Sequence, residues 1–85
     1  MDIEKLKSII ESVLLISGEP IKISKISKIS EASKPEIENA LMLLQNEYAN
    51  RGFAIIKKED MVEISTNPEN SKYVLELIKG EIQEN

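Results

Sequence analysis

The chain has 85 residues, of which 15 are acidic and 11 basic, and its formal net charge is −4. This length accommodates one small domain with one hydrophobic core, and the acidic balance opposes non-specific attraction to nucleic-acid phosphates. The absence of cysteine excludes disulfides and thiolate metal sites, and no apolar run approaches the ~20 residues of a membrane-spanning helix. We therefore expect a soluble, untargeted domain.

The first helix is predicted over residues 2–17. Asp2 is a plausible N-cap, and Gly18 followed by Pro20 supplies a C-terminal stop. Leu15 lies roughly opposite the centre of the apolar face, so we expect it to be exposed. The side chains expected to face the core are Ile3, Leu6, Ile9, Ile10, Val13, Leu14 and Ile16.

The segment IKISKISKIS, residues 21–30, repeats isoleucine, serine and lysine in triplets. In a strand, residues three apart point to opposite faces, so Ile23, Ile26 and Ile29 could not share one core. In a helix the same side chains fall within an arc of about 120°. The spacing therefore predicts a short helix over about 24–30 with these isoleucines directed inward.

A longer helix is predicted to begin at a capping box formed by Ser33 and Glu36, with Pro35 in the first turn and Gly52 as its end. A short helix, a tight connection and a longer capped helix form a helix-turn-helix pattern. The expected core stripe of the longer helix is Ile37, Ala40, Leu41, Leu44 and Tyr48.

A β-hairpin is predicted over residues 53–66, with Lys-Glu-Asp between its two strands, although the turn does not fix the register. Asn67 followed by Pro68 then predicts the start of a last helix, which is expected to reach Lys79 and to stop at Gly80. Its expected inward side chains are Tyr73, Val74, Leu77 and Ile78.

This order of elements predicts the α+β class and a winged-helix domain. It combines a three-helix core containing the helix-turn-helix, a two-stranded wing and an additional C-terminal helix. The domain is expected over residues 1–80. Residues 81–85 are expected to form a tail or the start of a linker to a second winged-helix domain.

DNA reading by the second helix of the pair would be the usual role of this fold, but the residues argue against it. Lysine and arginine are absent between Pro35 and Asn50, so arginine cannot read guanine there. We expect no sequence-specific DNA binding. The simpler interpretation of the remaining lysines is a solvated edge. The candidates for weak phosphate contact are Lys25, Lys28, Lys57 and Lys58.

Catalysis is not expected. Histidine and cysteine are absent, which removes the usual general base and the best nucleophile. Each of the three glycines falls at a predicted helix end, and no glycine-rich phosphate loop occurs. We expect no enzyme activity, no cofactor and no metal site.

Apolar side chains off the predicted core faces suggest contact with another protein. Leu15 and Met42 lie outside the core faces of their helices, and Leu43 lies at the margin. These three residues are the candidate partner or dimer surface. The alternative is that the wing or the last helix covers them, since single exposed apolar residues are common.

The order of features resembles the segregation and condensation protein B family. The first helix ends in an aliphatic cluster and SGEP, the long helix closes with Asn-Arg-Gly, the first wing strand is hydrophobic, and Asn-Pro precedes the last helix. The resemblance extends from Leu6 to about Lys79. Two departures are Lys58-Glu59-Asp60-Met61 at the wing turn, where the family often has glycine, and an end where the family continues into a second winged-helix domain.

This resemblance implies a non-enzymatic accessory subunit of the bacterial SMC–kleisin complex, which compacts and segregates chromosomes. It further implies a homodimer that binds the kleisin subunit, segregation and condensation protein A (ScpA), and reaches the SMC protein through that kleisin. The implied location is the cytoplasm, at the nucleoid, with no membrane contact.

Two other interpretations stay open. The first is a winged-helix DNA-binding transcription regulator, in which Asn39 and Gln45 would read bases and the four candidate lysines would anchor phosphates. The second is a structural domain of a larger enzyme whose catalytic part lies downstream.

Overall fold

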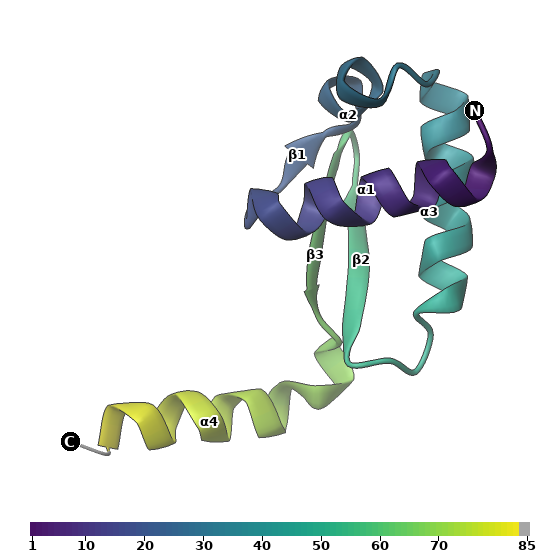
Figure 1. The fold of residues 1–85 in the computed structure, drawn as a ribbon. Helices are drawn as coiled ribbons and strands as arrows, with labels where there is room; N and C mark the ends of the chain where they lie inside the picture. The colour runs from purple at the N-terminus through teal and green to yellow at the C-terminus, as the bar shows by residue number, and fades with distance from the viewer. Residues whose placement is uncertain (84–85) are drawn as a thin grey trace.

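The protein is described here by a computed structural model, which covers the backbone of residues 1–83 and the side chains of residues 1–80. Three helices pack against a small sheet, and a fourth helix extends away from them (Figure 1). The predicted α+β winged-helix architecture with an additional C-terminal helix is confirmed. The elements in order are α1 (Ile3–Ser17), β1 (Ile21–Lys22), α2 (Ile23–Ser30), α3 (Lys34–Glu47), β2 (Phe53–Lys58), β3 (Met61–Thr66), the 3-10 helix η1 (Pro68–Asn70) and α4 (Ser71–Gln83).

One aliphatic core lies between α1, α2, α3 and the sheet. Burying each large aliphatic side chain contributes about 1.5–3 kcal/mol, which explains how a chain with few aromatics builds a stable interior. Most of the side chains predicted to face inward from α1 and α3 do so. The buried hydrophobic residues are Leu6, Ile10, Leu14, Ile23, Ile26, Ala32, Ile37, Ala40, Leu41, Leu44, Ile55 and Val62.

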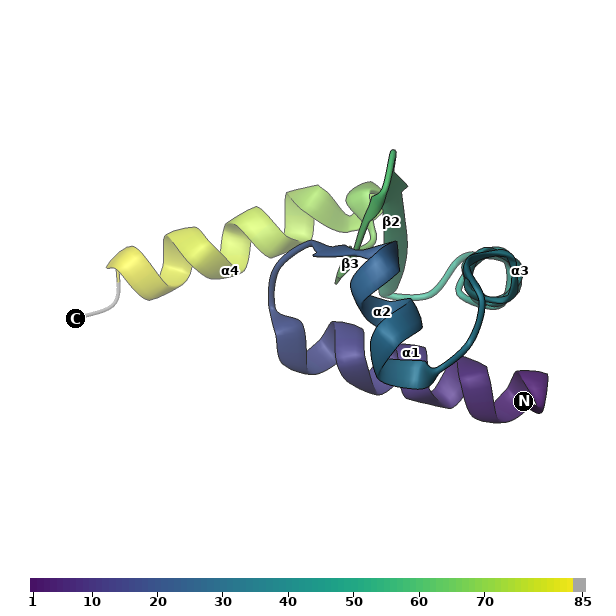
Figure 2. The same cartoon turned by 90° about the horizontal axis from the view of Figure 1, so that it is seen from above.

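Both predicted ends of α1 are confirmed. The Asp2 carboxylate accepts a hydrogen bond from the Lys5 backbone N–H at 3.2 Å, and Gly18 takes the left-handed conformation with φ 65°. The prediction that Ile16 faces the core is wrong, since its side chain is 87% exposed. Ile16 is two residues, or about 200° of rotation, beyond the buried Leu14, so it points away from the core, and this end of α1 extends past β3 in both views (Figures 1 and 2).

The isoleucine triplets form α2, as predicted, but only two of them reach the core. Ile23 and Ile26 are buried, whereas Ile29 is 52% exposed, which corrects the expected inward position. A three-residue period drifts by about 60° per step around a 3.6-residue helix, so the third isoleucine has rotated out. Ser30 is buried instead, and its hydroxyl donates to the Ile26 carbonyl at 2.8 Å.

The sheet has a third strand that the sequence analysis did not predict. β1 pairs with β3, giving the strand order β1-β3-β2. A two-residue strand is too short to show alternation, so only the pairing of Ile21 with Val62 reveals it. The hairpin register is set by a two-residue turn, with Lys58 opposite Met61 and Glu59 at φ 57°.

The predicted end of α3 at Gly52 is wrong. The helix ends at Glu47, and the N–H of Tyr48 donates to the Leu44 carbonyl at 2.9 Å. The left-handed residue in the following loop is Asn50, with φ 68°, and asparagine tolerates that conformation better than most residues. Gly52 instead accepts a hydrogen bond from the backbone N–H of Asn67 at 2.9 Å, just beyond the hairpin.

The last helix begins as predicted but does not pack as predicted. The Asn67 side chain accepts from the Glu69 N–H at 2.9 Å, and η1 leads into α4. α4 continues through Gly80 to Gln83, so glycine is not its stop.

The expected inward residues of α4 do not reach the core: Val74 is half-buried and the other three are exposed. Both views show the helix running away from the domain (Figures 1 and 2). Residues 84–85 of the predicted tail lie outside the described residues.

Candidate protein-interaction surface

The outward side of α3 carries acidic and amide side chains. Glu38 faces the wing, where its carboxylate lies 3.9 Å from the Lys57 ammonium. Gln45 donates a hydrogen bond to the Ile55 carbonyl at 3.1 Å, so its amide is tied to the sheet. Of the two candidate base-reading residues, Asn39 makes no side-chain hydrogen bond within residues 1–80, whereas Gln45 does.

The candidate phosphate contacts gather at one end of the domain, because α2 and the wing turn lie together there (Figure 1). Lys25, Lys28 and Lys58 are exposed. Carboxylates lie at the same end of the domain. The Asp60 carboxylate forms an ion pair with the Lys34 ammonium at 3.2 Å. This mixed charge is typical of a solvated edge, and it weakens the potential that a phosphate backbone would meet.

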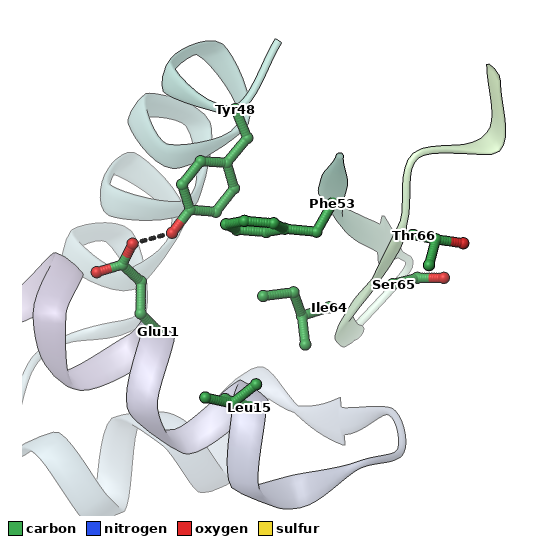
Figure 3. A pocket seen from close by; sticks show the side chains of 7 residues that line it. All are labelled: Glu11, Leu15, Tyr48, Phe53, Ile64, Ser65 and Thr66. Carbon is green, nitrogen blue, oxygen red and sulfur yellow. Dashed lines mark hydrogen bonds between the residues drawn. The ribbon is translucent and has the colours of Figure 1, made fainter. Parts of the chain in front are cut away.

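An apolar groove opens at the other end of the hairpin, between α1, the end of α3 and the sheet (Figure 3). Its volume is about 580 Å³. Apolar side chains dominate its surface, and the sheet contributes a hydroxyl edge where β3 ends. The lining residues are Glu11, Leu15, Tyr48, Phe53, Ile64, Ser65 and Thr66.

Two aromatic rings and one carboxylate fix the inner wall of this groove. The rings of Tyr48 and Phe53 meet edge to face, with centroids 4.6 Å apart at 65°. The Tyr48 hydroxyl donates a hydrogen bond to the Glu11 carboxylate, as the dashed line in Figure 3 shows. The only charged group of the lining is thus already paired, and Leu15 and Phe53 offer exposed hydrocarbon, at 73% and 43% exposure.

The candidate partner residues do not form one surface around this groove. Leu15 lines it, as an exposed residue on α1. Met42 is 53% exposed on α3 and Leu43 is half-buried, and neither contributes to the lining. Phe53 and Ile64 were not predicted as partner-surface residues, because the strand pattern shows only that these residues are apolar. Which face they occupy depends on the hairpin register, which the turn residues did not reveal.

The chemistry of the groove suits apolar contact. Among the described side chains, no group of three or more carboxylates could hold a metal ion. No helix within residues 1–83 combines the length and the apolar content needed to cross a bilayer. An open, mostly hydrocarbon surface with one internally paired carboxylate resembles the centre of a protein–protein contact, where desolvation costs little.

Comparison with known proteins gives one consistent family. The family model described as "Segregation and condensation complex subunit ScpB" matches residues 8–85. Segregation and condensation protein B of Clostridium botulinum (strain Kyoto / Type A2) is 39% identical over 82 residues, which cover 94% of this chain and 42% of the relative. The corresponding protein of Alkaliphilus oremlandii (strain OhILAs) is 37% identical over 79 residues, covering 91% and 43%. The chain thus spans less than half the length of these relatives.

Solved structures share the fold. ScpB from Mycobacterium tuberculosis superposes with a TM-score of 0.90 at 18% identity, covering 100% of this chain and 54% of that one. A dimer of the ScpB N-terminal domain complexed with ScpA peptide gives a TM-score of 0.79 at 23% identity, covering 88% and 96%. The family match extends over residues 8–85 of 85. This chain therefore belongs to the family of the segregation and condensation complex subunit ScpB.

Proposed function

We propose that this chain is a non-enzymatic accessory part of the bacterial SMC–kleisin complex. It acts in chromosome condensation and segregation as a homodimer that binds the kleisin ScpA, and it reaches the SMC protein through that kleisin. Its place is the cytoplasm, at the nucleoid. Residues 1–80 are the winged-helix domain of this subunit, and residues 81–85 lead toward the second winged-helix domain that the resemblance implies.

The observation that carries this proposal is the charge of the exposed side of α3. This is the helix that a DNA-reading winged helix would place in the major groove, yet between Pro35 and Asn50 it carries no cation. DNA phosphates would repel an acidic surface at this position. The exposed side of α3 is therefore better suited to contact with a protein partner than with DNA.

The relatives support the same partners. A solved relative is described as a dimer of the N-terminal domain complexed with ScpA peptide, and it covers 88% of this chain. The exposed apolar side chains give this chain a means of making such contacts. We assign Leu15, Met42 and Leu43 to partner contact, with Leu15 in the groove and the other two on α3.

The test compares protein and DNA partners of the same purified chain. Light scattering at micromolar concentration is expected to give twice the chain mass, and calorimetric titration with full-length ScpA is expected to show saturable binding. Fluorescence anisotropy with a duplex oligonucleotide, at low and at high salt, is expected to show no binding below micromolar concentration.

A transcription regulator would give the opposite result. Submicromolar duplex binding that weakens steeply with salt would contradict the proposal, since each phosphate contact adds about 0.9 to the slope of log K against log salt. The double substitution Lys25→Glu and Lys28→Glu serves as the control variant. It should leave ScpA binding unchanged, whereas it would abolish DNA binding by a regulator.

A further inference from the structure

α4 carries an apolar surface that the described part of the chain does not cover. Tyr73 is 69% exposed, Leu77 65% and Ile78 46%. The helix packs chiefly against η1, the short turn that leads into it. A helix of 13 residues is marginal in water when it stands alone, so most of its stability must come from packing an apolar face.

Four apolar residues of α4 share one face of the helix. Val74 and Ile78 are four residues apart and form one column, and Tyr73 and Leu77 form the adjacent column. The two described lysines, at positions 72 and 79, lie on the opposite side of the helix. One face is thus hydrocarbon over the described length, and the other carries both lysines together with Leu75, which is 55% exposed.

The groove described above begins where this helix leaves the domain. Ser65 and Thr66 line the groove, and α4 starts at Ser71. The connection is held in place: the Asn67 side chain donates to the Arg51 carbonyl at 2.8 Å, and the Ser71 hydroxyl donates to the Pro68 carbonyl at 2.6 Å. These bonds fix the start of α4, and the helix then runs away from the rest of the domain (Figures 1 and 2).

We propose that the groove receives α4 of a second copy of this chain, and that the exchange is reciprocal. This inference rests on the proposed homodimer and names its contact. Donor helix and receiving groove are both present in each chain, so a twofold axis satisfies both at once, as a self-complementary interface requires. The paired carboxylate of Glu11 leaves no free charge in the lining to oppose an apolar helix.

Size and charge agree with this occupant. Thirteen residues at 1.5 Å per residue give a helix about 20 Å long. A twofold dimer makes the helix-in-groove contact twice, which doubles the buried area, and a stable interface of standard size buries about 800 Å² per partner. The α4 sequence, with two lysines and two glutamates, is neutral, so it meets a chain of net charge −4 without repulsion.

The test uses single cysteines, because the chain has none of its own. Chains carrying Leu15→Cys are mixed with affinity-tagged chains carrying either Leu77→Cys or Ile78→Cys, and the mixture is oxidised. At least one pair is expected to form a disulfide between chains of different mass, since a bond requires Cα atoms within about 7 Å. The matched control pairs Leu15→Cys with Lys79→Cys, on the opposite side of the helix, and should remain unlinked.

A second measurement does not depend on oxidation. Leu77→Glu is expected to raise the dimer dissociation constant about 10- to 100-fold, because a large apolar side chain that the proposed contact buries is replaced by a charge. Lys79→Glu, on the opposite side of the helix, should leave it within about twofold of the parent chain. Far-UV circular dichroism of each variant checks that the helices are intact.

The outcomes separate this inference from the proposed function. If the parent chain dimerises and binds ScpA, but neither pair crosslinks and Leu77→Glu still dimerises normally, the exchange is wrong and the proposed function stands. A disulfide formed within one chain that carries both Leu15→Cys and Leu77→Cys would also overturn the exchange, because α4 would then fold back on its own groove. A parent chain that stays monomeric would defeat the proposed homodimer itself.

Discussion

The ammonium group of Lys7, in the second turn of α1, forms an ion pair with the carboxylate of Glu47, the last residue of α3. The same ammonium lies 3.0 Å from the Glu4 carboxylate. Lys7 is only 7% exposed, so its charge depends on these partners. The hydrogen bond that the ammonium donates to Glu47, and then the one it donates to Glu4, raise the pKa of Lys7 above its usual 10.5, although burial opposes the rise. The Lys7–Glu47 ion pair therefore links α1 to α3, two helices that are far apart in the sequence.

Substituting Glu47→Gln should destabilise the domain at neutral pH, because Lys7 would keep only its exposed partner Glu4. A raised lysine pKa contributes stability below the unfolded value of 10.5, and this contribution is lost as the pH rises through the folded value. The difference in unfolding free energy between the variant and the parent chain should therefore shrink above that pH. Urea unfolding at neutral pH and above 10.5 measures it.

Glu4→Gln is the matched control for this pair. The Glu4 side chain is 73% exposed against 50% for Glu47, so its contribution is screened by more water. An equal loss of stability from both substitutions would contradict the leading role given to Glu47.

Replacing Ser33→Ala should lower the unfolding free energy by about 1 kcal/mol, because it removes the N-cap of α3. The Ser33 hydroxyl accepts a hydrogen bond from the Glu36 N–H at 3.3 Å, and the Glu36 carboxylate accepts one from the Ser33 N–H at 2.9 Å. Urea titration followed by circular dichroism gives the value. Ser8→Ala, on the exposed side of α1, should have little effect.

The same capping box gives the domain a dependence on acid. Hydrogen bonds from the backbone and then the side chain of Ser33 lower the pKa of Glu36 below its usual 4.5. A depressed carboxyl pKa contributes stability above the unfolded value, and the contribution disappears as the pH falls through the folded value. Glu36→Gln should therefore show a smaller loss of stability than the parent chain on acidification below 4.5, measured by urea unfolding. Identical acid profiles would argue against the capping role.

Two isoleucines of the same triplet repeat should differ sharply on truncation. Ile26→Val should cost about 1 kcal/mol of unfolding free energy, because Ile26 is completely buried and the missing methyl leaves a cavity. Ile29→Val is the matched control and should be close to neutral, since Ile29 is 52% exposed. The unfolding free energies of both variants, from thermal and urea unfolding, test whether the third isoleucine lies outside the core.

Gly80→Ala should stabilise α4 by about 1 kcal/mol, because glycine is a poor helix interior residue. An added Cβ would meet nothing within 4 Å, and the residue lies within the helix. Slower amide exchange in α4 would show the effect. Gly18→Ala is the contrasting variant: its space is also open, but φ is 65°, so a side chain there should destabilise the end of α1 by about 1–2 kcal/mol.

Local signals predicted the helices well. Asp2, Ser33 and Asn67 each satisfy backbone donors within three residues, and such bonds depend only on neighbouring sequence. The two glycine stops that failed, Gly52 and Gly80, show the limit of the rule. Glycine permits a left-handed residue but does not require one, and a helix can end earlier or continue through it.

The sequence by itself determined the order of elements and most of the core, because helical spacing and caps act over a few residues. Only the tertiary structure decided where the exposed hydrocarbon gathers. It brought Leu15, Phe53 and Ile64 together from three elements, and it left most apolar side chains of α4 exposed, on a helix that extends away from the core (Figure 1). Such placements depend on strand register and on how elements pack across long stretches of chain, and no local pattern encodes either.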